Sequence, residues 1–316
     1  MLRGRLLTVH RWLALLACLP LVIVLLSGAG LSFVNEFDRA MHPALLSVAA
    51  SKPLDLEQIS TYIGSELETI EADLNAIRYP GSSYDPIRLQ LSSRTGQWLR
   101  YINPHTGKVL GDRNVSQDWS VKLRSLHMHL LETGSGSVVT LFATSVLLLM
   151  LGLGMSLLRR KSAWKVSGWH AWIGLCSAPV LLIICVSGLI SYSGISTIAS
   201  SDRLKPQLVT NLDDLIRRQH PEMIKTCSNG PSELMASASG ATLDCLNGDN
   251  WTFEVQAGEL SVRQSSKKQS LLWDLHSGAW AGLPGRAFWM WSVLGVFYLM
   301  YSGLNDWYRK VRGGRT

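Results

Sequence analysis

Four long stretches without a charged side chain constrain the fold of this chain more than any other feature. They cover residues 12–35, 133–158, 166–201 and 287–305. A helix needs about 20 apolar residues to cross the hydrocarbon core of a bilayer, and each stretch is about that long or longer. We therefore predict a membrane protein built on a four-transmembrane-helix bundle. The first stretch also has the basic start of a signal peptide, but its apolar run is longer than usual for one, which favours a retained helix.

Basic residues close to the stretches predict the orientation of the chain. Arg3, Arg5 and Arg11 precede the first stretch, the loop 159–165 joins the second and third, and the tail 309–316 follows the fourth. A chain that crosses four times has all these segments on one side, which is the cytoplasmic side. We expect a multi-pass protein of the bacterial inner (cytoplasmic) membrane with both termini in the cytoplasm. The net charge of +7 then reflects topology, and no nucleic-acid partner is expected.

Two longer polar segments between the stretches predict small periplasmic α+β modules. In the first, a helical pattern at 54–70 precedes two alternating runs at 87–93 and 97–104. In the second, a helical pattern at 212–223 precedes an alternating hairpin that turns at Gly258. The predicted layout is transmembrane helix 1 at 1–35, a periplasmic module at 36–126, helix 2 at 127–160, a cytoplasmic loop at 161–167, helix 3 at 168–196, a second periplasmic module at 197–274, helix 4 at 275–309 and a cytoplasmic tail at 310–316.

Two of the five cysteines, Cys227 and Cys245, share the second polar segment. A disulfide between them fits an oxidising compartment such as the periplasm. Two unrelated free thiols are the alternative. The chain has no C-x-x-C-H sequence, so covalent attachment of a c-type haem is not expected.

Histidines gather at the ends of the predicted spans within an internal repeat. The sequence HRWLALLACLPLVIVLLSG, which begins at His10, matches HAWIGLCSAPVLLIICVSG, which begins at His170. Both end in Ser-Gly, at Gly28 and Gly188. The sequences SLHMHLLETGSG and DLHSGAWAGLPG also match, and their alignment pairs His127 with His276. The repeat therefore predicts two pairs of equivalent histidines.

The expected topology turns these pairs into two sites. Spans one and three run outward, which places His10 and His170 near the cytoplasmic face. Spans two and four run inward, which places His127 and His276 near the periplasmic face, and equivalent helices of such a bundle are diagonal neighbours. Two facing imidazoles are the ligands expected for a b-type haem, so we predict two haem b groups. Gly28 and Gly188 would lie in the periplasmic layer and leave room for a porphyrin.

Simpler interpretations compete with this one. A single histidine at a membrane interface is more often an ordinary interfacial residue than a ligand. A metal site without porphyrin is a second alternative, but no Asp, Glu or Cys lies at an offset that completes a zinc shell. His129 is an alternative ligand to His127, or lines the site beside it; residues two apart on a helix point to different faces, and the repeat favours His127. The tryptophans near the span ends fit an interfacial aromatic belt.

The assembled motifs resemble the PepSY-associated transmembrane family. They are VHRWLAL, NPHTGKVLG, SLHMHLLETG, GWHAWIGL and LHSGAWAGLPGR, and they extend over nearly the whole chain. The resemblance implies a four-span protein with periplasmic PepSY-like modules, whose haem is held by the histidines that match here as His10, His127, His170 and His276. Members of the family include inner-membrane reductases of ferric siderophores.

The function expected from these features is electron transfer across the membrane to a ferric siderophore in the periplasm, an oxidoreductase activity in iron uptake. No dinucleotide-binding fingerprint is present, so the electron donor would be another protein, a quinol or a small reductant. The alternative is a membrane-tethered PepSY module that binds a partner or regulates a peptidase without redox activity. A proton or metal permease is less favoured, because no span has a mid-membrane Asp, Glu or Lys.

Overall fold

The computed structural model describes residues 2–49, 55–159, 168–199, 223–228, 230–237, 240–246, 249–256, 259–265 and 269–313. These residues belong to two compact units, each of which is assembled from separate parts of the chain. The helical unit comprises Met1–Val34, Lys122–Ser196 and Gln269–Thr316, and the sheet unit comprises Asn35–Val121 and Thr197–Lys268. The predicted cytoplasmic loop 161–167, most of the predicted helix 212–223 and the turn at Gly258 lie outside the described residues.

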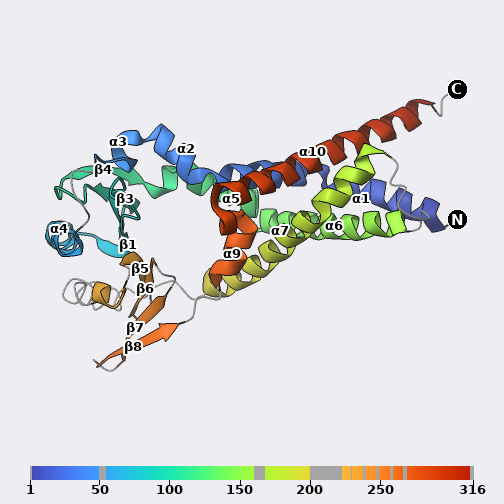
Figure 1. Cartoon of the computed structure of the whole chain (residues 1–316). Helices are drawn as coiled ribbons and strands as arrows, with labels where there is room; N and C mark the ends of the chain where they lie inside the picture. Colours follow the sequence, from blue (N-terminus) through green and yellow to red (C-terminus); the bar gives the residue numbers. More distant parts are fainter. Residues whose placement is uncertain are drawn as a thin grey trace. The chain divides into compact units, whose positions relative to one another are not determined.

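Four long helices dominate the helical unit, and they confirm the four predicted spans. They are α1 (Leu2–Ser32), α6 (Ser135–Arg159), α7 (Trp169–Ala199) and α10 (Gly282–Gly313). Each contains a segment that is long and apolar enough to cross a membrane. Helix α1 begins and α10 ends at the same end of this unit (Figure 1).

Two short helices precede the second and fourth spans, where the sequence predicted continuous helices at 127–160 and 275–309. These are α5 (Trp119–His129) and α9 (Gln269–Ser277), and a 3₁₀ turn, η2 (Ala279–Ala281), follows α9. The chain breaks after α5 because Leu130 and Leu131 adopt positive φ angles of 48° and 70°, and after α9 because Gly278 has a φ of 75°. Both short helices lie at the end of the helical unit opposite the chain termini (Figure 1).

Small and apolar side chains hold the long helices together. Ala17 of α1, Ala143 of α6 and Cys185 of α7 belong to one buried cluster. Helices α7 and α10 approach closely at Gly295, where an added Cβ would lie 2.5 Å from Ser177 Oγ. Small residues at such crossings allow backbones to approach, which is how helices pack in a bilayer.

The sheet unit contains one eight-stranded antiparallel sheet with the order β4-β3-β2-β1-β5-β6-β7-β8. The sequence predicted two modules, and each contributes four strands to this sheet. The two halves meet where β1 pairs with β5, in the register Ile77 opposite Leu234, and Arg78 forms an ion pair with Glu233 at 3.0 Å. The pairing satisfies backbone groups that two separate sheets would leave open at their edges. The strands are β1 (Asp73–Arg78), β2 (Ile87–Ser93), β3 (Gly96–Ile102), β4 (Val109–Asn114), β5 (Pro231–Ser237), β6 (Gly240–Cys245), β7 (Asn250–Gln256) and β8 (Glu259–Ser265).

Helix α4 (Leu56–Thr69) supplies one side of the core of the sheet unit. Asp55 caps its first turn by accepting hydrogen bonds from the amides of Glu57 and Gln58. Ile59, Ile63 and Leu67 recur at helical spacing and are almost fully buried. They pack in one cluster with alternate residues of the strands, which are Ile87, Leu89, Leu91, Leu234, Leu243 and Phe253.

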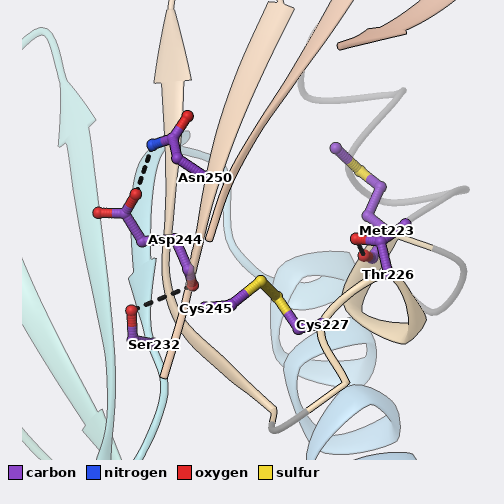
Figure 2. The surroundings of a disulfide bond; sticks show 7 residues. All are labelled: Met223, Thr226, Cys227, Ser232, Asp244, Cys245 and Asn250. Carbon is purple, nitrogen blue, oxygen red and sulfur yellow. Dashed lines mark hydrogen bonds between the residues drawn. A yellow bond between two sulfur atoms is a disulfide. The ribbon is translucent and has the colours of Figure 1, made fainter. Parts of the chain in front are cut away.

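A disulfide joins Cys227 to Cys245 within the same core, with a Cα–Cα distance of 5.4 Å. Figure 2 shows it running from the segment after a short helical turn at Met223 to the end of β6. Both cysteines are less than 10% exposed. The bond therefore ties the segment that precedes β5 to the sheet.

A partly buried ion-pair network fixes α2 (Val34–Met41) to the sheet. Arg113 of β4 donates to both carboxylate oxygens of Asp38 at 2.9 Å and to Asp118 at 2.6 Å. Trp119 Nε1 also donates to Asp38, at 3.1 Å. Burial raises the pKa of Asp38, but the hydrogen bonds from Arg113 and Trp119 outweigh it, so the pKa lies below its ordinary value.

The remaining elements of the sheet unit are short. The 3₁₀ helix η1 (Val115–Gln117) directly follows β4 in the sequence. Helix α3 (Pro43–Leu46) contacts β4. Asn114 caps η1 by accepting a hydrogen bond from the amide of Ser116.

Candidate functional site

His127 and His276 face each other from α5 and α9. Their ring centroids lie 6.1 Å apart, and the ring planes are inclined by 55°. The structure thus brings together the two residues that the repeat paired. Both residues lie outside the four candidate spans, at the end of the helical unit where α5 and α9 lie.

Matching hydrogen bonds orient the two rings. His127 Nδ1 lies 2.9 Å from the carbonyl oxygen of Val24, and His276 Nδ1 lies 2.9 Å from that of Ile184. A carbonyl oxygen only accepts, so each Nδ1 must carry the hydrogen. In a neutral ring the lone pair is therefore on Nε2, the form in which histidine binds a metal.

The pKa values of this pair favour neutral rings at physiological pH. Burial and, to a smaller extent, the neighbouring His276 lower the pKa of His127 to about 4. Burial also lowers the pKa of His276. Neutral imidazoles are the form that iron binds, so no proton has to be displaced from Nε2 at pH 7.

Gly28 and Gly188 make room for these imidazoles. A Cβ added at Gly28 would lie 2.8 Å from Cε1 of His127, and one added at Gly188 would lie 2.7 Å from Cε1 of His276. Both distances are shorter than a normal carbon–carbon contact. The glycines were expected to leave space for a porphyrin. In the structure, the histidine rings occupy the space beside them, and Cε1 is the ring atom nearest to each glycine.

His10 and His170 line a second candidate site, which is a cavity of about 330 Å³ in the other half of the helical unit. All four long helices contribute to its wall, which is mainly aliphatic and includes Gly154, Gly174 and Gly303. A Cβ added at Gly154 would lie 4.0 Å from Cε1 of His10, and one at Gly303 would lie 3.9 Å from Cε1 of His170. His10 and His170 therefore lie in equivalent positions, each beside the corresponding glycine of the repeat.

The polar partners of His10 and His170 differ. His170 Nδ1 lies 2.7 Å from Ser302 Oγ, and that hydroxyl donates to the carbonyl of Leu299 at 3.1 Å, so the hydroxyl accepts from His170. His10 Nδ1 is buried and has no hydrogen-bond partner among the residues that the structure describes.

His129 has a different environment from His127. Its Nδ1 lies 2.8 Å from Ser137 Oγ, at the start of α6. Its ring meets Tyr192 of α7 edge-on at 6.3 Å. The structure thus places His129 among residues of α6 and α7, while His127 is the residue that faces His276.

These residues fit haem b on three observations. Two imidazoles bound on opposite sides of one metal ion at about 2 Å have ring centres roughly 6 Å apart, which matches the 6.1 Å between His127 and His276. The hydrogen bonds from Nδ1 leave Nε2 for iron. The cavity at His10 and His170 has an apolar wall and lies in the size range of cofactor pockets. No group of three or more His, Cys, Asp and Glu side chains that could hold a metal ion occurs in the described part of the chain.

Several residues of the site were not singled out from the sequence. Ser302 is one, although it precedes Gly303 just as Ser27 precedes Gly28 and Ser187 precedes Gly188. A search for Ser-Gly pairs opposite the histidines would have found it. Arg124 and Trp273 are others. They precede His127 and His276 by about one helical turn, and the guanidinium carbon of Arg124 lies 5.6 Å from the centroid of the Trp273 ring. Their sequence positions carry no distinctive signal.

Comparison with known proteins gives one family. The sequence model of the family described as the PepSY-associated TM region matches residues 7–310, which is nearly the whole chain. A search of curated proteins finds no match.

Proposed function

The chain belongs to the family of the PepSY-associated TM region, and from that premise we propose that it is an inner-membrane, di-haem b-type electron-transfer protein that reduces ferric siderophores in the periplasm. The observation that carries the proposal is the repeated histidine geometry. His127 and His276 face each other at 6.1 Å, and His10 and His170 line one cavity. Haem in these sites would supply reversible one-electron chemistry, with a potential set largely by its axial ligands.

The protein's own residues would hold and orient the two groups. Val24 and Ile184 accept the Nδ1 hydrogens of His127 and His276, which fixes the rotation of both rings. Such outer partners also raise the basicity of the coordinating nitrogen. The apolar wall around His10 and His170 would exclude water and favour a flat macrocycle.

The separation of the two places supports transfer across the bilayer. Gly28, which contacts His127, lies 18 positions after His10 on α1, and a helix rises about 1.5 Å per residue. The two layers are therefore about 27 Å apart along α1, which is close to the thickness of the hydrocarbon core. With the termini in the cytoplasm, as the basic segments favour, His10 and His170 form the cytoplasmic layer.

A ferric chelate suits the periplasmic side as the oxidant. Siderophores bind hard Fe(III) through oxygen donors, and one electron converts it to the softer Fe(II), which these donors hold less well. The reduction needs no nucleophile or general acid from the protein. The electron would come from a quinol, a reductase or a small reductant.

The test is electron transfer in proteoliposomes. Purified protein is inserted into vesicles with dithionite trapped inside and a ferric hydroxamate chelate outside, and Fe(II) is followed with a coloured ferrous chelator. We expect protein-dependent Fe(II) formation that is lost in His10→Ala and in His276→Ala. Protein that carries haem but forms no Fe(II) would refute the substrate. A colourless, folded preparation would refute the whole proposal and favour a PepSY module that binds a partner without redox activity.

A further inference from the structure

The four histidines each pack beside a glycine, and the residue before that glycine differs at one place only. Ser27, Ser187 and Ser302 precede Gly28, Gly188 and Gly303, but Leu153 precedes Gly154. Each of the three serines lies near the Nδ1 atom of its histidine, at 3.3 Å for His127, 3.4 Å for His276 and 2.7 Å for His170. His10 faces the glycine that follows the leucine.

This difference leaves His10 without the support that the other three rings have. The Nδ1 atoms of His127 and His276 also donate to carbonyl oxygens, and that of His170 donates to Ser302. His10 Nδ1 is buried without a partner among the described residues. Because a hydrogen bond at Nδ1 fixes a ligating imidazole and strengthens its bond to metal, His10 should be the weakest of the four ligands.

The ring of His10 is also held less tightly than that of His127. A Cβ added at Gly154 would lie 4.0 Å from Cε1 of His10. At His127 the corresponding distance from Gly28 is 2.8 Å, so that ring is held tightly against α1. Displacement is therefore opposed at His127 and His276. His170 has the same clearance as His10, with 3.9 Å from an added Cβ at Gly303, but its hydrogen bond to Ser302 holds it, so His10 is the ligand that is displaced.

We propose that His10 is a displaceable ligand, so that the haem site between His10 and His170 has a binding position for a small neutral ligand of ferrous iron, such as carbon monoxide. This inference rests on the proposed function, since it requires haem at that site. It assigns the binding position to one of the two sites and explains it by one residue, Leu153.

The test is carbon monoxide binding to the dithionite-reduced, haem-loaded full-length protein, followed by the shift of the Soret band. We expect binding to one of the two haem groups in the wild type. Leu153→Ser places a hydroxyl where Ser302 stands in the other half and should weaken carbon monoxide binding 10- to 100-fold, the range expected for an outer partner of a ligand. Leu153→Ala is the matched control, since it shortens the side chain without adding a hydroxyl, and should bind as the wild type does.

The reciprocal variant, Ser302→Leu, removes the partner of His170 and should strengthen carbon monoxide binding. A haem-loaded protein that does not bind carbon monoxide would overturn the inference and leave the proposed function intact. Equal affinities in the wild type and Leu153→Ser would also overturn it. A preparation without haem would overturn the proposed function itself, and this inference with it.

Discussion

Gly28→Ala is the most informative small change in the helical unit, because the added methyl group meets a proposed haem ligand. The new Cβ would lie 2.8 Å from Cε1 of His127. Carbon atoms in contact prefer about 3.5–4.0 Å, so the imidazole must retreat from α1 by roughly 0.7–1.2 Å. Val24 is on the same helix, so the 2.9 Å distance from its carbonyl oxygen to Nδ1 lengthens as the ring retreats. At about 3.6 Å or beyond, this contact is no longer a hydrogen bond.

The expected effect on binding follows from that lost hydrogen bond. Removal of an outer partner of a ligating histidine costs about 10- to 100-fold in metal affinity. The effect on folding is smaller, because two contributions oppose each other. Overpacking costs about 1–3 kcal/mol, while alanine is favoured over glycine inside a helix by about 1 kcal/mol. We therefore expect a clear loss of haem affinity with at most a modest loss of stability.

The assay is transfer of haem from the purified protein to an excess of a haem-scavenging protein, with absorbance as the readout. Gly28→Ala should release one haem equivalent at least tenfold faster than the wild type. Gly188→Ala should behave in the same way, since its Cβ would lie 2.7 Å from Cε1 of His276. Gly152→Ala is the control, because nothing lies within 4 Å of its added Cβ. Equal haem release from Gly28→Ala and Gly152→Ala would refute the reasoning.

Two further predictions concern the sheet unit. Replacement of Cys227 and Cys245 by alanine should destabilise it by about 3 kcal/mol, since the bond closes a loop with a sequence separation of 18; hydrogen exchange of β5 and β6 measures this, and unchanged protection would contradict it. The pKa of Asp38 is lower in the folded protein than its ordinary value of 3.8. The ionised carboxylate therefore stabilises the fold fully at pH values above 3.8, and this contribution is lost as the pH falls through the folded-state pKa. Asp38→Asn should therefore lower the free energy of unfolding by about 2 kcal/mol at pH 7, because it weakens the hydrogen bonds from Arg113. Hydrogen-exchange protection of β4 that is identical in wild type and variant at pH 7 would show that the ion pair contributes nothing.

The four spans could be predicted because a transmembrane helix is a local property of composition and length. The breaks before the second and fourth spans could not. One depends on Leu130 and Leu131 in the left-handed region, which residues other than glycine rarely adopt, so their identity gives no sign of a turn. The other contains Gly278, but a glycine inside an apolar pattern is compatible with a continuing helix.

The single sheet could not be predicted because its central contact is not local. Individual strands follow from alternating residues, and the hairpins within each half follow from short connections. The pairing of β1 with β5 joins Ile77 to Leu234, with the whole of α6 and α7 between them in the sequence. Neither strand contains a feature that identifies the other as its partner.

The arrangement of the candidate site follows partly from the repeat. Equal offsets in the two halves indicate which histidines are equivalent, and the structure brings His127 to His276 and lines one cavity with His10 and His170. Sequence offsets do not give the distance of each ring from its neighbouring helix. For that reason the role of Gly28, which contacts the imidazole itself, became visible only in the structure.

Haem content is the most direct measurement of the central claim that this bundle holds two porphyrins between paired histidines. We predict a pyridine-haemochrome ratio of two haem b per chain for the wild type. We predict one per chain for each variant with a single substitution of His10, His170, His127 or His276 by alanine. A full complement of haem in all four variants, or a wild-type chain purified from haem-replete cells without any, would contradict the claim.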